Sequence, residues 1–591
     1  MKKLINKPEN VVQEMCHGIV LAHPELELLP RHKVIKRKKL NPDKVSLISG
    51  GGSGHEPAHA GFVGKGMLDA AVCGDVFASP SQIQVYEAIR STAGKKGVLL
   101  IIKNYSGDMM NFQNAAHLAR EDGIEVDFVK VDDDVAVQDS LYTVGRRGVA
   151  GTVFVHKIAG AAAEKGCSLS EVKAVAERVI TNVKSVGFAL SSCTVPAKGT
   201  PTFTLAENEM EYGVGIHGEP GIMRKALQEA DELASQMVHA ICNDLGFSNN
   251  GKGQEQQVAL MVNGFGSTPL MELYLMNKAV AKEIHKRGIV IARSFVGNYM
   301  TSIDMAGASV TILKLDDELK SLLDAPCEVP GFKVSSSPES VPYDDPYAGE
   351  LANDDVCYEV ETPVLSAKVE NSFSLQNMIY LVDSISACCI RNEVAFCELD
   401  AHAGDGDFGM SVAKGFRELK RQWKRIINIP ELTISSFLTE CSLVIMEHCG
   451  GASGPIWGSA FRAAGKQADG LTALTVSDIA AMLQAAVKGI QQTGERSFGR
   501  GALVGDKTLI DALVPCADAW SAAATGSASF AEAFMSGARA AVEGAKSTEA
   551  IVARMGRAGT VGERSLGHPD AGAHALGIIF TEIAELLNFH P

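Results

Sequence analysis

Short apolar segments alternate with amphipathic segments through the first 330 residues of this chain. The apolar segments predict buried β-strands at 45–48, 97–102, 126–131, 258–262 and 289–292. Helical spacing of apolar residues lies between them, for example over 81–93 and 169–186. This alternation predicts an α/β domain over residues 1–330, with helices covering a largely parallel sheet. In such folds, ligands bind at the loops that follow the carboxyl ends of the strands.

From about residue 367 the pattern becomes helical. Apolar residues recur at helical spacing over 374–394, 434–448, 476–492, 506–524, 530–546 and 573–588. In the last segment Leu576, Ile579 and Ile583 mark one face. Residues 367–591 are therefore predicted to form an all-α helical bundle or barrel. Residues 331–366 are rich in Pro, Ser and paired Asp, which predicts a linker, with a surface excursion of one domain as the alternative.

Length, charge and cysteine content narrow the class of protein. A chain of 591 residues is too long for one hydrophobic core. Its net charge of −15, with basic residues concentrated only at 31–39, argues against a nucleic-acid partner. No apolar run reaches the roughly 18 residues of a membrane span, and the N-terminus lacks the core of a signal peptide. Thirteen cysteines without a paired framework predict reduced thiols in a cytoplasmic protein.

A glycine-rich segment follows the first predicted strand. Residues 49–57 read Ser-Gly-Gly-Gly-Ser-Gly-His-Glu-Pro, so the backbone can approach a small ligand closely. A glycine-rich turn of this kind also occurs for packing reasons alone. The histidine at its lip, His55, followed by Glu-Pro, makes a binding function the more specific interpretation.

Two further segments carry candidate chemistry in the first domain. Lys103 and Asp108 follow the strand at 97–102 and would reach the same strand-end crevice as His55. Asp108 could act as a general base on a hydroxyl, or it could cap a helix beginning near Met109. His217 lies among the glycines of 213–221, where its own segment offers no side chains to enclose the ring. Its nitrogen is then accessible for chemistry or ligation; the alternative is a loop histidine without a role.

The second domain contains a cluster of carboxylates. Asp400, Asp405 and Asp407 lie within eight residues on a turn too glycine-rich for a helix. Carboxylates this close repel each other unless cations neutralise them, and their oxygens suit Mg²⁺, which commonly arrives with substrate phosphates. The segment therefore indicates a nucleotide site, with a solvated acidic turn as the alternative. It also fits a dinucleotide fingerprint and the start of a calcium loop, but the preceding strand and the closing glutamate are missing.

Glycine-rich loops separate several of the predicted helices in the second domain. They occupy 449–455, 505–509 and 556–573. Backbone N–H groups at the helix N-termini that follow such loops can bind phosphate. Gathered at one end of a bundle, these loops would form a nucleotide pocket.

Taken together, these segments resemble the dihydroxyacetone kinase family. Segments 51–57, 103–108 and 213–221 resemble its dihydroxyacetone-binding K domain, and segments 399–409, 505–509 and 556–573 resemble its nucleotide-binding L domain. The resemblance follows the family's order and spans nearly the whole chain. It indicates the ATP-dependent type, in which both domains share one chain.

The resemblance implies phosphorylation of dihydroxyacetone, and of glyceraldehyde, in a cytoplasmic homodimer. His217 would hold the ketone as a covalent hemiaminal, Asp108 would act as base on the terminal hydroxyl, and His55 would assist. The implied substrate-binding residues are Gly52, Ser53, Gly54, His55, Lys103 and Asp108. Asp400, Asp405 and Asp407 would hold two Mg²⁺ ions. The implied ATP contacts are Phe408, Gly409, Met410, Ser411, Ala452, Ser453, Thr508, Leu509, Arg557, Asp570, Ala571 and Gly572.

The chain departs from the family pattern in the nucleotide half. The departures are Met410, Ser411, Ala452, Arg500 and Gly559-Thr560. They bear on details of the ATP contacts and leave open a phosphotransferase-linked unit that retains ADP. Other interpretations are a kinase of erythrulose or another ketose, and a ketose sensor without activity, against which the intact His217, Asp108 and aspartate cluster argue. A side activity that cyclises FAD is a further alternative. The size of the pocket near Phe77, Tyr105 and His217 would separate one ketose from another.

Overall fold

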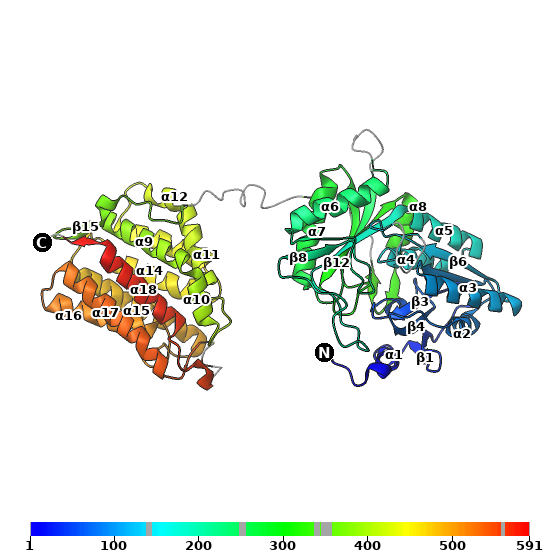
Figure 1. Ribbon diagram of the computed structural model, residues 1–591. Helices are drawn as coiled ribbons and strands as arrows, with labels where there is room; N and C mark the ends of the chain where they lie inside the picture. Colours follow the sequence, from blue (N-terminus) through cyan, green and yellow to red (C-terminus); the bar gives the residue numbers. More distant parts are fainter. Residues whose placement is uncertain are drawn as a thin grey trace. The chain divides into compact units, whose positions relative to one another are not determined.

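The chain forms two compact units, Met1–Asp345 and Pro346–Pro591, in the computed structural model (Figure 1). The structure describes residues 2–137, 145–247, 256–335, 343, 357–556, 559 and 562–589. Each hydrophobic core cluster of the described residues draws its side chains from one unit only. No described helix is both long and apolar enough to cross a membrane.

The first unit contains two six-stranded sheets. The first has the order β1-β2-β4-β3-β5-β6, in which β3, β4, β5 and β6 run parallel. Its strands are β1 (Leu26–Leu29), β2 (Val34–Arg37), β3 (Ser46–Ser53), β4 (Ala70–Val76), β5 (Val98–Lys103) and β6 (Val126–Val131). The expected parallel sheet is confirmed for these central strands.

Helices cover both faces of this sheet, which explains why its strands are continuously apolar. On one face Ile48, Leu100 and Ile102 pack with side chains of α2 (Gln82–Thr92) and α3 (Ser106–Glu121). On the other face Leu47 and Leu99 pack with α4 (Thr152–Glu164) and α5 (Leu169–Asn182). The amino-terminal helix α1 (Val11–Ala22) packs against β1 and β4.

The second sheet has the order β11-β10-β12-β7-β8-β9, and only β10 and β11 pair in parallel. Its strands are β7 (Val183–Ala189), β8 (Glu209–Tyr212), β9 (Met223–Ala226), β10 (Gln257–Gly264), β11 (Val290–Gly297) and β12 (Gly307–Leu315). The expectation of a largely parallel sheet is wrong here, because apolar runs mark strands without marking their partners. The predicted helix over 169–186 was also too long, since the chain turns into β7 after Asn182.

Three more helices and a two-stranded hairpin belong to the first unit. Helices α6 (Ala230–Asp244) and α7 (Leu270–His285) pack their apolar side chains on the second sheet. Helix α8 (Asp317–Asp324) contacts α4 and leads into a hairpin of β13 (Cys327–Val329) and β14 (Phe332–Val334). Strand β14 thus occupies the beginning of the predicted linker, of which 336–342 and 344–356 lie outside the described residues.

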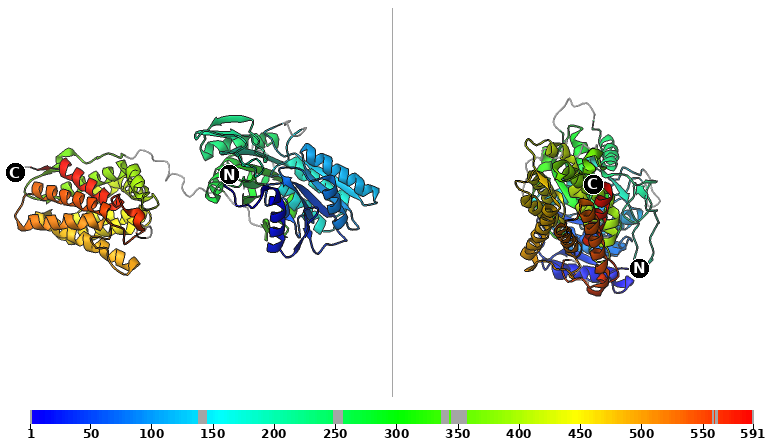
Figure 2. Two further views of the ribbon diagram at one scale, coloured as in Figure 1. Left: turned by 60° about the horizontal axis from the view of Figure 1, so that its bottom comes forward. Right: turned by 90° about the vertical axis from the view of Figure 1, so that its left-hand side faces the viewer.

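The second unit is a bundle whose helices lie side by side (Figure 2). The helices are α9 (Leu375–Arg391), α10 (Glu393–Asp400), α11 (Phe408–Arg421), α12 (Trp423–Ile427), α13 (Ile434–His448), α14 (Ser453–Gln467), α15 (Val476–Phe498), α16 (Ile510–Thr525), α17 (Phe530–Ser547) and α18 (Ala571–Leu586). Helices α9, α13, α15 and α17 each begin with a capping box. Two-residue strands pair as β15 (Lys368–Val369) with β18 (Asn588–Phe589), and β16 (Phe373–Ser374) with β17 (Ala473–Leu474).

Candidate functional site

Two histidines from distant parts of the first unit meet at the carboxyl end of β3. The strand continues to Ser53, so residues 49–53 of the predicted glycine-rich turn at 49–57 are extended strand, and Gly54 and His55 follow them directly. His55 Nδ1 lies 2.8 Å from the carbonyl oxygen of Thr301. Its Nε2 lies 3.3 Å from Nε2 of His217, in the loop after β8. Because Nδ1 of His55 must donate to the carbonyl, its Nε2 is the acceptor that faces His217.

Aromatic rings enclose His217. Its ring centroid lies 4.5 Å from that of Tyr105 and 5.3 Å from that of Phe77, both in edge-on arrangements. The ring of Phe77 also stacks on His55 at 5.2 Å. The enclosing side chains come from other segments, as the glycine-rich surroundings of His217 require. Burial, together with the charges of Lys103 and Arg147, lowers the pKa of His217 to about 3, so the imidazole is neutral near pH 7.

Lys103 and Asp108 lie beside this histidine pair at neighbouring element ends. Lys103 is the last residue of β5, and Asp108 is in the first turn of α3. The capping interpretation of Asp108 is wrong, because the helix begins earlier, at Ser106, with Tyr105 as its N-cap and no side-chain cap bond. Lys103 Nζ lies 3.8 Å from Asp108 Oδ2. Burial raises the pKa of Asp108, and no hydrogen-bond donor among the described residues contacts its buried Oδ1.

A second pair of histidines, His59 and His156, contacts Lys103, and the sequence did not predict it. Lys103 Nζ lies 2.9 Å from Nε2 of His59, and His59 Nδ1 lies 3.0 Å from Nε2 of His156. Both histidines are buried, and burial lowers the pKa of each. His59 lies four residues after His55, but nothing in the sequence around it distinguishes it from an ordinary core histidine.

Arg147 fixes the loop that carries His217. Its guanidinium donates to Asp134 Oδ2 at 2.7 Å, to the Gly213 carbonyl at 2.8 Å and to Glu219 Oε1 at 3.1 Å. The other oxygen of Glu219 accepts the backbone N–H of His217 at 2.8 Å. The loop is therefore held on both sides of the histidine by one buried cation. No pattern in the sequence predicts this role of Arg147, because Gly213 and Glu219 lie far from it along the chain.

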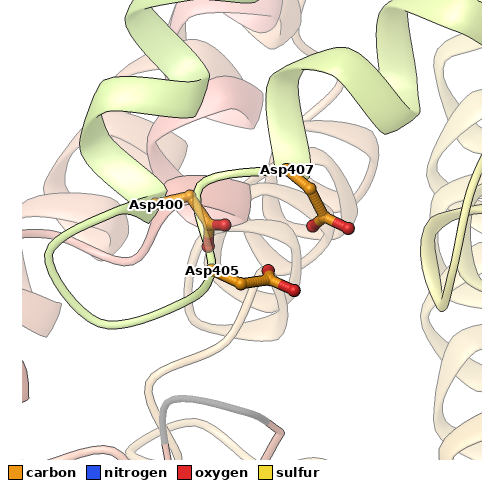
Figure 3. A group of neighbouring side chains, drawn as sticks. All are labelled: Asp400, Asp405 and Asp407. Atoms are coloured by element: carbon orange, nitrogen blue, oxygen red, sulfur yellow. The ribbon is translucent and has the colours of Figure 1, made fainter. Parts of the chain in front are cut away.

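In the second unit, Asp400, Asp405 and Asp407 direct their carboxylates into one small space (Figure 3). Asp400 ends α10, Asp407 precedes α11, and Asp405 lies on the loop between them. One oxygen from each carboxylate lies within 4.8 Å of the others. Burial and the two neighbouring carboxylates raise the pKa of Asp400. Three convergent carboxylates fit a hard divalent cation such as Mg²⁺.

The carboxylates line one end of a pocket of about 200 Å³. Of the residues predicted to contact a nucleotide, those that line it are Phe408, Ser411, Ala452, Ser453, Thr508, Leu509, Asp570, Ala571 and Gly572. Gly409 and Met410 do not line it. A Cβ at Gly409 would collide with the carbonyl of Glu393, so this glycine permits close packing of α11 on α10, and the Met410 side chain is exposed. Arg557 lies outside the described residues.

Four helix N-termini converge on this pocket. The first residues of α11, α14 and α18, and the residue that precedes α16, are among its lining. Helix N-termini carry partial positive charge and free N–H groups, so they bind anions. A pocket that combines these N-termini with three carboxylates fits a polyphosphate bound together with divalent cations. Lys507 and Gly451, which lie in two of the predicted glycine-rich loops, also line it, and so does Trp457, which the sequence interpretation did not assign to the site.

Arg500, one of the departures from the family pattern, has a local explanation. Its guanidinium contacts both carboxylate oxygens of Asp506, at 2.5 and 2.9 Å. Asp506 also accepts the backbone N–H of Leu503 at 2.8 Å. Arg500 therefore braces the loop before α16, at a position outside the pocket lining.

Comparisons with known proteins match a separate domain family to each unit. The Dak1 domain family matches residues 17–331, and the DAK2 domain family matches residues 402–585. The L-erythrulose 1-kinase of Mycolicibacterium smegmatis is 34% identical over 596 residues, covering 99% of this chain and 100% of that protein. The chain belongs to the dihydroxyacetone kinase family. Like these relatives, it is a kinase.

Of two more relatives, one matches the first unit and the other matches nearly the whole chain. The dihydroxyacetone-binding subunit of PTS-dependent dihydroxyacetone kinase 1 from Listeria innocua is 52% identical over 319 residues, which is 54% of this chain and 95% of that subunit. The crystal structure of the C. freundii dihydroxyacetone kinase in complex with AMP-PNP and Mg²⁺ has a TM-score of 0.58 and 31% identity, and the match covers 99% of both chains. The Dak1 match falls on the unit with the histidines, and the DAK2 match on the unit with the carboxylates.

Proposed function

We propose that this kinase transfers the γ-phosphoryl group of MgATP to the terminal hydroxyl of dihydroxyacetone, and of glyceraldehyde. The observation that carries the proposal is the enclosed, neutral imidazole of His217, 3.3 Å from the acceptor nitrogen of His55. We assign ketose binding to residues 1–330 and nucleotide binding to 367–591, joined by 331–366.

The histidine pair can form and stabilise a hemiaminal. His55 Nε2 would accept the proton of His217 Nε2, and the in-plane electron pair freed on that nitrogen would bond to the ketone carbon as the π bond of the carbonyl opens. His55 would then pass the proton to the former carbonyl oxygen, so that the adduct is neutral. Because a polyol such as glycerol has no carbonyl, it cannot be held in this way.

Asp108 would act as the general base on the hydroxyl that receives the phosphoryl group. Its buried Oδ1 lacks a hydrogen-bond donor among the described residues, so a substrate hydroxyl would supply one. Its pKa is raised by burial, which makes the carboxylate a better proton acceptor. Lys103, held by His59, would contribute a cation beside the same hydroxyl, and Gly52, Ser53 and Gly54 would contact the substrate through their backbone.

The second unit would hold the nucleotide. Asp400, Asp405 and Asp407 would bind two Mg²⁺ ions, which neutralise the charge on the transferring phosphoryl group when bound. The residues around them position the phosphates through helix N-termini, and positioning with charge neutralisation dominates phosphoryl transfer.

The test is an assay of ADP release by the purified protein with dihydroxyacetone, glyceraldehyde, L-erythrulose and glycerol, combined with intact mass spectrometry. We expect turnover of dihydroxyacetone with ATP alone, no turnover of glycerol, and a mass increase on the protein that His217→Ala abolishes. Unchanged kcat and KM for dihydroxyacetone in His217→Ala would refute the hemiaminal.

Erythrulose is a second candidate substrate, because a relative that aligns over 99% of this chain is an L-erythrulose 1-kinase. The same assay separates the two ketoses through kcat/KM. The Listeria relative raises a further alternative, in which retained ADP is rephosphorylated by a phosphotransferase partner. Multiple turnovers with purified protein and ATP would exclude it.

A further inference from the structure

Lys507 places a buried ammonium group among four backbone carbonyl oxygens of the second unit. Its Nζ lies 2.8 Å from the oxygen of Thr548, 3.3 Å from that of Ile551, 2.5 Å from that of Ser565 and 2.8 Å from that of His568. The three ammonium hydrogens are thus shared among four acceptors.

The four carbonyls come from the two ends of one segment of the pocket wall. Thr548 and Ile551 lie at the end of α17, in and just after the short helix η4 (Thr548–Ala550). Ser565 and His568 lie just before α18, whose first residues line the pocket. Between these ends, Met555 and Gly556 also line the pocket. One ammonium group therefore ties both ends of the segment to the loop that carries Thr508.

By themselves, the backbone conformation and the burial of Lys507 lower the stability of the fold. Lys507 has φ of +62°, a left-handed conformation that is strained for a residue with a side chain. Its charge is removed from water, and burial lowers its pKa although Asp570 opposes the shift. Without a cation at the centre, four carbonyl dipoles would point their negative ends at one another. Rings of carbonyl oxygens of this kind replace the hydration shell of a bound monovalent cation in K⁺ channels.

We propose that Lys507 is a positioning residue whose ammonium replaces a bound monovalent cation and holds the phosphate-facing loops of the pocket in their binding geometry. The inference rests on the proposed nucleotide site. Loss of the ammonium weakens nucleotide binding and leaves the ketose adduct in the first unit intact.

Two variants separate the charge from the packing. Lys507→Gly accepts the positive φ without strain and opens a space beside the carbonyls. Lys507→Met fills the same space with an apolar side chain of similar length and no charge. By calorimetry, we expect both to bind MgAMP-PNP roughly 10- to 100-fold more weakly than the wild type, the range for hydrogen bonds made by charged groups.

Chemical rescue provides the decisive measurement. Ammonium or ethylammonium chloride should restore MgAMP-PNP affinity in Lys507→Gly, whereas tetramethylammonium chloride at equal ionic strength should not. The same salts should leave Lys507→Met and the wild type unchanged. The mass of the ketose adduct should persist in both variants. A lysine that only stabilised the fold would change the melting temperature and leave the MgAMP-PNP affinity of the folded variant unchanged.

Several outcomes would overturn the proposal. Wild-type affinity in Lys507→Met would do so, and so would a loss in Lys507→Gly that no cation repairs. If Lys507→Gly does not fold in sodium chloride, its melting temperature in ammonium and in tetramethylammonium chloride decides instead. A higher value in ammonium supports the cation replacement, and equal values refute it. A wild type that binds no MgAMP-PNP refutes the proposed function, while the melting experiment still decides the role of Lys507.

Discussion

Replacing Arg147 with Met would disconnect the His217 loop from its support and leave the buried Asp134 carboxylate without its cation. Arg147 is 2% exposed, and Asp134 is 1% exposed. Removing one partner of a buried ion pair costs about 3–5 kcal/mol, because the remaining charge stays buried. Burial already raises the pKa of Asp134 to about 6 with the arginine present. Without Arg147 this pKa rises further, so Asp134 is protonated at pH 7. The loss of unfolding free energy is then about 3 kcal/mol, the lower end of that range.

The pH dependence of this variant has a definite sign. A carboxyl whose pKa is higher in the folded than in the unfolded state binds its proton more tightly when folded. It therefore favours folding at low pH and loses that contribution as pH rises through the folded pKa. The difference in unfolding free energy between Arg147→Met and the wild type should accordingly grow from pH 6 to pH 8.

The catalytic effect of Arg147→Met follows from the loop contacts. The variant loses the bond to the Gly213 carbonyl and leaves Glu219, which accepts the His217 N–H, without its cation. A displacement of about 1 Å of a reacting group can cost about 100-fold in rate. We expect kcat/KM for the ketose to fall by about that factor and adduct occupancy to fall with it, while MgAMP-PNP affinity is unchanged.

The neighbouring Arg146 supplies a matched control. It makes a two-pronged ion pair with Asp244 at 2.6 and 2.7 Å, with side chains 22% and 23% exposed. Surface pairs contribute about 0–1 kcal/mol, so Arg146→Met should retain stability and activity. Urea unfolding, adduct mass spectrometry and steady-state kinetics measure the three quantities. Equal losses in both variants, or a destabilised Arg147→Met with full adduct formation, would refute the reasoning.

Three further predictions test other parts of the two sites. The pKa of His156 is lowered by burial to about 3, so the unfolded chain takes up its proton first and stability falls below pH 6.5. His156→Gln should therefore reduce the slope of unfolding free energy between pH 6.5 and 5 by about 1.4 kcal/mol per unit, whereas the exposed control His117→Gln should parallel the wild type; parallel slopes for both would contradict this. Asp405→Asn should abolish the thermal stabilisation by Mg²⁺ and AMP-PNP, about 2.7 kcal/mol at a ligand concentration of 100 Kd, and should still form the ketose adduct. Asp108→Asn should also form the adduct but turn over about 10²–10⁴-fold more slowly, and a wild-type kcat would remove Asp108 from its role as base.

The sequence predicts those parts of the molecule that depend on local pattern. Apolar runs locate the central strands of the first sheet, and helical spacing locates most of the bundle. Asp400, Asp405 and Asp407 are neighbours in the chain, so their convergence follows from spacing and from the surrounding glycines. The meeting of His55 with His217 depends on the fold, but both lie in glycine-rich segments that indicate close approach of a ligand.

Other features could not be predicted, because they depend on partners chosen by the tertiary fold. The antiparallel pairing of β10 with β12 leaves no trace in an apolar run. Arg147 and Lys507 act on backbone carbonyls or on distant carboxylates, and a carbonyl has no signature in the sequence. The predicted nucleotide contact of Gly409 fails for a different reason. Its motif indicates a ligand, but the backbone of α10 occupies the space beside this glycine.

The separation of the hydrophobic cores has a consequence for how genes can encode the two units. Within the described ranges, no core cluster combines side chains of both units. A chain break between the units would therefore leave each of these core clusters whole within one half, and each half should remain folded after it. Gene fission or fusion at this point is then close to neutral for folding, so a lineage can carry the two halves as one polypeptide or as two.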